Sequence, residues 1–108
     1  MPAVLTHGDL WAMNVLGHPA GGLTLIDPAV SYTWAEVDLS MLSSCPRPPA
    51  SDRFFRAYQD VNPLPAGWAE RMPLLHLREL LSTIAHEADS GWAVQRVRDT
   101  LAPFCRQA

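Results

Sequence analysis

Residues 7–14 read HGDLWAMN, and residues 27–29 read DPA directly after a short apolar run, LTLI, at positions 23–26. Between these two motifs, HPAGG at positions 18–22 has the turn chemistry of a β-hairpin, because its glycines can adopt positive φ. We therefore predict a β-ribbon over residues 14–27. A polar loop would precede this ribbon, and an aspartate would stand where its second strand ends.

The sequence outside this ribbon predicts one further strand, over residues 2–6, and about four helices. The predicted helices cover 36–43, which ends before the prolines of 45–49; 51–58, with Ser51 as N-cap; 73–88, with Pro73 in its first turn; and a last helix capped by Ser90. Two apolar stripes at helical spacing should face the core: Leu74, Leu77, Leu81, Ile84 and Ala88 on the third helix, and Val94, Val97, Leu101 and Phe104 on the fourth. The predicted fold class is α+β, a short β-hairpin followed by helices.

Composition limits the class of protein. The chain has 108 residues, 48% of them hydrophobic, which predicts a single globular domain over residues 1–108. Its net charge of −3 argues against binding to nucleic acid. We find no apolar run of ~18 residues and no signal peptide, so we expect no membrane span and a cytoplasmic protein. Cys45 and Cys105 lack CxxC spacing, which favours free buried thiols over a disulfide.

The order Asp9, Asn14, Asp27 suits phosphoryl transfer, whose catalysis depends on positioning and charge neutralisation. One carboxylate is needed near the acceptor hydroxyl, and oxygen ligands must hold Mg²⁺ against the phosphates. The interval from Asp9 to Asn14 equals that in the protein-kinase loop H-R-D-x-x-x-x-N. Gly8 stands in place of the arginine, and Pro28-Ala29 in place of the Phe-Gly that follows the metal-binding aspartate.

The motifs HGDLWAMN, LIDPAVSY (25–32) and EVDL (36–39) resemble those of the fructosamine kinase (ketosamine-3-kinase) family. This family belongs to the aminoglycoside-phosphotransferase-like group, which has a protein-kinase-like fold. Trp11 and the Asp27-Pro28-Ala29 triplet are the specific part of the match. Residues 54–75 are similar in register, so the resemblance extends over most of the chain.

The resemblance implies an ATP-dependent transferase that phosphorylates a sugar hydroxyl of a ketosamine, either small or protein-bound. Asp9 would be the catalytic base that accepts the proton of this hydroxyl. Asn14 and Asp27 would bind Mg²⁺ on the phosphates of ATP. These are the site residues and cofactors that we expect.

The resemblance also implies roles for three neighbouring residues. His7, in the catalytic loop, would brace that loop rather than react. Asp38 would be the helix aspartate that hydrogen-bonds the loop backbone. Trp11 would either line the substrate side or pack in the core.

The family's nucleotide-binding lobe has no counterpart here. The chain contains no lysine and no phosphate-cradling glycine loop. The resemblance therefore implies that it is a portion of the C-lobe of the kinase-like fold, and this is what we expect. Two alternatives remain open. The chain could be a non-catalytic binding domain, or its acceptor could be an aminoglycoside or a choline-like alcohol, against which Trp11 and Pro28 count. We also expect the surface facing the absent lobe to expose apolar side chains and to favour a homodimer.

Overall fold

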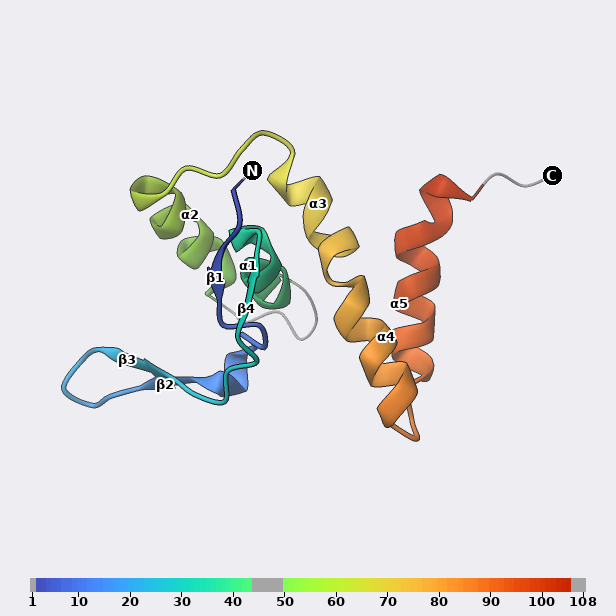
Figure 1. Cartoon of the computed structure of the whole chain (residues 1–108), viewed down its shortest axis with the longest axis horizontal. Helices are drawn as coiled ribbons and strands as arrows, with labels where there is room; N and C mark the ends of the chain where they lie inside the picture. The colour runs from blue at the N-terminus through green and yellow to red at the C-terminus, as the bar shows by residue number, and fades with distance from the viewer. Residues whose placement is uncertain (1, 44–49, 106–108) are drawn as a thin grey trace.

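The computed structural model describes residues 2–43 and 50–105, and within them it shows two small antiparallel sheets and five α-helices (Figure 1). The predicted α+β class is therefore confirmed. About four helices were predicted. The structure has five among the described residues, because one predicted helix is divided into two.

The predicted β-ribbon is present as β2 (Val15–Gly17) and β3 (Leu23–Leu25), paired antiparallel with Val15 opposite Leu25. Its turn uses the predicted glycines: Gly21 and Gly22 have φ of 90° and 93°. Glycine tolerates these angles because it has no Cβ.

The other sheet contains one strand that the sequence did not predict. β1 (Val4–Thr6), expected as a strand, pairs antiparallel with β4 (Ser31–Thr33). A hydrogen bond from the Thr6 hydroxyl to the Ser31 carbonyl, 2.9 Å long, reinforces the pairing. This sheet returns the chain to its start, so the loop after β1 and the loop before β4 lie next to each other.

The first two helices agree with the sequence apart from their ends. α1 is Ala35–Ser43 and α2 is Ser51–Val61. The N-cap of α2 is Ala50, so the prediction of Ser51 as the cap was wrong by one residue. Cys45 and the prolines expected to end α1 lie outside the described residues.

The predicted helix over 73–88 was wrong as a single element. It is divided into α3 (Trp68–Leu75) and α4 (Leu77–His86), and Pro73 lies inside α3 rather than in a first turn. Proline has no N–H to donate and its ring crowds the preceding turn, so a helix that contains it is weakened there. The chain leaves regular helix at His76, three residues later.

The final helix, α5 (Gly91–Leu101), begins after Ser90 as predicted and continues into a short 3₁₀ turn, η2 (Ala102–Phe104). The two apolar stripes were only partly right. Leu80 and Ala93 are the buried side chains between α4 and α5, whereas Leu81 and Phe104 are exposed. Cys105, expected to be buried, is an exposed free thiol.

The main core joins α1, α2 and α3 through Leu39, Phe55 and Met72. Trp68 stacks on Phe55 with ring centroids 5.2 Å apart and an interplanar angle of 18°. Aromatic pairs in this offset arrangement add to the stabilisation that burial gives.

An ion pair between the buried Glu36 and the partly exposed Arg71 also ties α1 to α3. The Arg71 guanidinium donates to both carboxylate oxygens of Glu36, at 2.8 and 2.7 Å, and Glu36 is 1% exposed. These hydrogen bonds raise the pKa of Arg71, although burial opposes them. Such a bidentate pair fixes the relative position of two helices.

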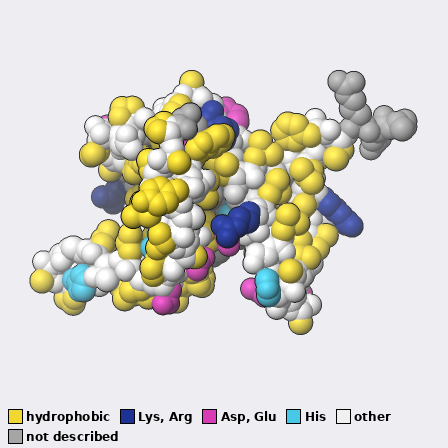
Figure 2. Space-filling model, in the orientation of Figure 1, with side chains coloured by type: hydrophobic (Ala, Val, Ile, Leu, Met, Phe, Trp, Pro, Cys, Tyr) yellow, Lys and Arg dark blue, Asp and Glu magenta, His cyan; other side chains and the backbone are white. Residues whose placement is uncertain are grey.

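The molecule is elongated, 55 × 35 × 27 Å, and α4 and α5 extend from the body as a pair (Figure 1). Apolar side chains are widespread on the surface in Figure 2. Those on or beside the strands are Val4, Leu5, Leu16, Leu23, Leu25, Val30 and Tyr32. The described helices include none with the length and apolar content needed to cross a bilayer.

Candidate functional site

The loop after β1 is held by Asp38 of α1. The two carboxylate oxygens of Asp38 accept hydrogen bonds from the backbone N–H groups of His7 and Gly8, at 2.8 and 2.9 Å. This is the contact that the resemblance implies for Asp38. It fixes the backbone of the loop directly before Asp9.

His7 is fully engaged in structural hydrogen bonds. Its Nδ1 accepts the backbone N–H of Asp9 at 3.2 Å, and its Nε2 lies 2.7 Å from the carbonyl oxygen of Ile26. Because Nδ1 is an acceptor, Nε2 carries the proton and donates it to Ile26. His7 thus connects the two loops and has no free nitrogen for proton transfer.

The backbone at position 8 leaves no room for a side chain, so an arginine such as that of protein kinases could not stand in place of Gly8. Its φ is +88°, and a Cβ placed on it would lie 1.9 Å from the carbonyl oxygen of Ala29. The Ala29 N–H donates to the His7 carbonyl at 2.8 Å, which holds the two backbones together. Only glycine fits here, because any side chain would overlap the backbone of the 27–29 loop.

Asn14 is buried, 5% exposed, beside Asp9. Its Nδ2 donates to the backbone carbonyl of Asp9 at 2.8 Å and to the Asp9 carboxylate at 3.2 Å. With Nδ2 so placed, the side-chain oxygen is the atom that a metal ion would bind. The Asn14 carbonyl also accepts the Ile26 N–H at 3.0 Å, which brings Asp27 next to Asn14.

Asp27 is the one non-glycine residue among the described residues with positive φ, at 50°. Aspartate tolerates this left-handed conformation better than most residues, and such angles are enriched at functional sites. Its side chain is exposed. One amide oxygen and one exposed carboxylate form a donor set that Mg²⁺ accepts when phosphate and water supply its other ligands. No group of three or more His, Cys, Asp or Glu side chains in residues 2–43 and 50–105 could hold a metal ion.

Asp9 and Trp11 line a cavity of about 340 Å³ between the loop and the α4–α5 pair. This volume lies in the range of small-molecule sites. Its other walls include His76, Glu79 and Trp92, none of which the sequence identified as site residues. Trp11 is 42% exposed, so it lines this cavity instead of packing in the core.

The position of Glu79 in this cavity changes the pKa of its carboxyl group. Burial raises the pKa of its carboxyl group, the Arg78 guanidinium opposes this, and the negative charge of Asp9 adds to the rise. Asp9 and Glu79 are therefore close enough to repel each other.

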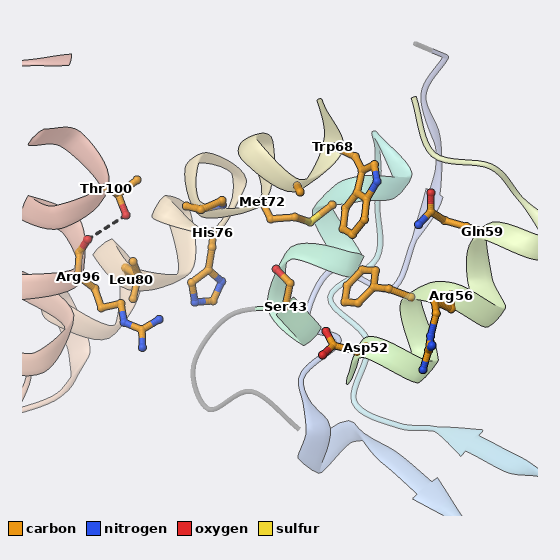
Figure 3. A pocket seen from close by; sticks show the side chains of 13 residues that line it. Ser43, Asp52, Arg56, Gln59, Trp68, Met72, His76, Leu80, Arg96 and Thr100 are labelled. Carbon is orange, nitrogen blue, oxygen red and sulfur yellow. Dashed lines mark hydrogen bonds between the residues drawn. The ribbon is translucent and has the colours of Figure 1, made fainter. Parts of the chain in front are cut away.

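A larger cavity of about 650 Å³ lies on the other side of His76, between α2, α3 and α5 (Figure 3). Phe55 and Trp68 form part of its wall, with Arg96 opposite. The His76 ring projects into the space between these elements in Figure 3. Burial, with a smaller contribution from Arg96, lowers the pKa of His76, so its ring is neutral near pH 7.

Comparisons with known proteins identify the family of the chain. A sequence model of the fructosamine kinase family matches residues 1–98. A protein of Enterococcus faecium named as a ketoamine kinase is 42% identical over 80 residues, which are 72% of this chain and 27% of that protein. A crystal structure of a protein of Thermobifida fusca, described as a fructosamine-3-kinase, superposes with a TM-score of 0.81 at 37% identity and covers 94% of this chain and 35% of that one.

A second solved structure, from Haemophilus somnus and also described as a fructosamine-3-kinase, has a TM-score of 0.75 at 21% identity and supports the fold alone. The chain spans about a quarter of the length of the first curated relatives that it matches. The family match covers most of its residues and includes both loops. The chain belongs to the fructosamine kinase family.

Proposed function

We propose that this chain is a C-lobe portion of an ATP-dependent ketosamine kinase and carries its acceptor-side machinery. The observation that supports this most directly is the position of Asp9. Its backbone is fixed through Asp38 and His7, its carboxylate is held by Asn14, and it lines a cavity of small-molecule size.

In the proposed reaction, Asp9 accepts the proton of a sugar hydroxyl as the hydroxyl oxygen attacks the γ-phosphorus of ATP and ADP leaves. General bases of this kind contribute roughly 10²–10⁴-fold to the rate. Asn14 and Asp27 would hold Mg²⁺, which when bound neutralises charge on the phosphates. His7 positions the loop and exchanges no proton.

The test supplies the chain with a nucleotide-binding lobe and measures MgATP-dependent phosphorylation of 1-amino-1-deoxyfructose. Asp9→Asn should reduce kcat by at least about 10²-fold. Asp99→Asn, on the exposed surface of α5, is the matched control and should leave kcat unchanged. Absence of turnover, or full activity of Asp9→Asn, would refute the proposal.

The alternative of a non-catalytic binding domain is favoured by one observation, the complete absence of lysine to grip nucleotide phosphates. Calorimetry of the 108-residue chain with MgATP separates the two candidates. Micromolar binding argues against a purely structural remnant, whereas no heat of binding together with no turnover supports it.

We also propose that the apolar side chains on the strands associate with a second copy of the chain. Val4, Leu5 and Leu25 line a cavity together with Phe54 and Tyr58. Contiguous apolar surface of this kind favours association. Light scattering should give a mass that rises with concentration, and a monomer at all concentrations would contradict this.

A further inference from the structure

The larger cavity, of about 650 Å³, is separate from the site beside Asp9. It lies between α2, α3 and α5, and among the described residues only His76 and Leu80 line both cavities. None of residues 7–14 or 27–29 lines it. Its volume is that of a small-molecule site. The proposed kinase chemistry therefore leaves this cavity without a role.

The His76 side chain lacks a hydrogen-bond partner although it is almost completely buried. The residue is 7% exposed, and its Nδ1 is buried with no hydrogen-bond partner among the described residues. Figure 3 shows the ring projecting into the larger cavity from the junction of α3 and α4. A buried nitrogen without a partner is destabilising, and native structures rarely contain one. A ligand oxygen would supply the missing partner, because one nitrogen of a neutral imidazole always carries a hydrogen to donate.

The charge at this end of the cavity favours an anion. The Arg96 guanidinium is close enough to His76 to lower the pKa of its ring, so both groups face the same part of the cavity. Arg96 is exposed and forms no ion pair with a described carboxylate, so it is available to a ligand. Asp52 is the one carboxylate among the described lining residues, and it already has an interaction of its own. Arginine binds carboxylates through strong, often bidentate hydrogen bonds.

The middle of the cavity is apolar and aromatic. In Figure 3, Arg96 and His76 lie at one end and Arg56 lies at the other. The Met72 side chain and the Trp68 indole lie between these ends. Thioether and indole groups both make favourable contacts with an aromatic ring. Because the two guanidinium groups are at opposite ends, the end beside His76 offers one positive charge and suits a carboxylate better than a phosphate dianion.

We propose that the larger cavity binds a small aromatic carboxylate. The carboxylate group accepts hydrogen bonds from Arg96 and His76, and the aromatic ring packs against Met72 and Trp68. This site is additional to the acceptor and nucleotide sites of the proposed kinase and does not depend on them. A ligand bound there gives the buried imidazole its missing partner.

Three probes that differ in charge and in apolar content test the proposal by calorimetry on the 108-residue chain. They are phenylacetate; phenylacetamide, which has nearly the same shape without the charge; and acetate, which has the charge without the ring. We expect phenylacetate to bind at least about tenfold more tightly than either of the others, because it alone makes both the charged contact and the apolar contact. Equal affinity for phenylacetate and either other probe, or no binding of phenylacetate at millimolar concentrations, would overturn the proposal.

Two variants test the residues that hold the carboxylate. Arg96→Met removes the charge and should abolish the preference for phenylacetate over phenylacetamide. Arg98→Met, on α5 and outside the described lining of the cavity, is the matched control and should retain it. His76→Phe keeps a ring without nitrogen atoms and should weaken phenylacetate severalfold. Circular dichroism establishes that each variant is folded. A folded Arg96→Met with the full preference, or a folded His76→Phe that binds phenylacetate normally, would refute the assigned contact.

NMR of the indole N–H groups shows which cavity the probe occupies. Trp68 lines the larger cavity, whereas Trp11 and Trp92 line the cavity beside Asp9. Phenylacetate should shift the Trp68 signal and leave the other two unmoved. Shifts at Trp11 and Trp92 without one at Trp68 would place the probe beside Asp9 and contradict the proposal. These measurements need no turnover, so their outcome is independent of the kinase proposal.

Discussion

The loop region around Asp9 and the helical region that follows it are held together by different forces. In the loop region, Asp38, His7 and Gly8 join three backbone segments through short hydrogen bonds and a close approach that excludes a Cβ. In the helical region, Phe55 and Met72 pack by shape and apolar burial, and Leu80 does the same against α5. The loop region should therefore respond to changes of a single atom, and the helical region to changes of volume.

The most damaging single change should be Phe55→Ala in the helical core. Phe55 is 4% exposed and stacks on Trp68, so its removal leaves a cavity as well as losing burial. We expect the free energy of unfolding to fall by about 3–5 kcal/mol, measured by urea denaturation. Phe54→Ala, at a position 41% exposed, is the control and should cost less than half as much. Equal losses would mean that volume does not govern this region.

Gly8→Ala tests the loop region with the smallest available side chain. The added Cβ meets the Ala29 carbonyl, and φ of +88° is itself unfavourable for alanine. The expected loss of unfolding free energy is about 2–4 kcal/mol. Gly91→Ala adds the same methyl group where no atom lies within 4 Å, and it should be neutral or slightly stabilising. If both variants unfold alike, the close approach is unimportant.

Asp38→Asn changes one atom without changing volume. The amide keeps one acceptor for the N–H groups of His7 and Gly8 but turns an N–H group toward the other. We expect a loss of about 1.5–3 kcal/mol, together with faster hydrogen exchange at the His7 and Gly8 amides. Asp99→Asn, where the carboxylate accepts only an exposed hydrogen bond from Gln95, should change stability by less than about 0.5 kcal/mol. Unchanged exchange in Asp38→Asn would argue against its tethering role.

The smallest expected effect is on the pH dependence of stability. It concerns His76, which lies where the loop region meets the helical region. The pKa of His76 is lowered from 6.5 in the folded protein by burial and by Arg96. Below pH 6.5 the unfolded chain binds this proton more readily than the folded chain, so stability should fall as pH falls through this window. Removing the group by His76→Gln should flatten the dependence of the melting temperature on pH by a few degrees. His86→Gln, at an exposed position, should leave the dependence unchanged.

The loop region could be predicted in part from short sequence patterns, because its turns and the order of its polar groups depend on residues close together in the sequence. The β2–β3 hairpin followed from glycines in a turn, and the interval from Asp9 to Asn14 gave the order of polar groups in the loop. Asp38 was identified through the family resemblance, and its hydrogen bonds have the expected partners. What the sequence could not give was β4, since three residues, Ser31–Thr33, form a strand only because β1 is available to pair with them.

The helical region was predicted less well because its details depend on contacts between distant residues. The periodicity of residues 73–88 suits one helix, yet Pro73 and the packing around His76 divide it. The same periodicity favoured Leu81 over Leu80, although packing against α5 buries Leu80. Glu79 and Trp92 belong to no motif, and only the folded chain brings them to the cavity beside Asp9.

The contact between Gly8 and Ala29 also has a consequence for protein engineering. The carbonyl of Ala29 fills the space that a side chain at position 8 would need, so the HGD and DPA motifs behave as one unit encoded in two places. Replacing Gly8 by the arginine of a protein kinase would require the 27–29 loop to be rebuilt at the same time. Grafts between kinase families should therefore exchange both loops together, and chimeras that carry only one of them are expected to misassemble.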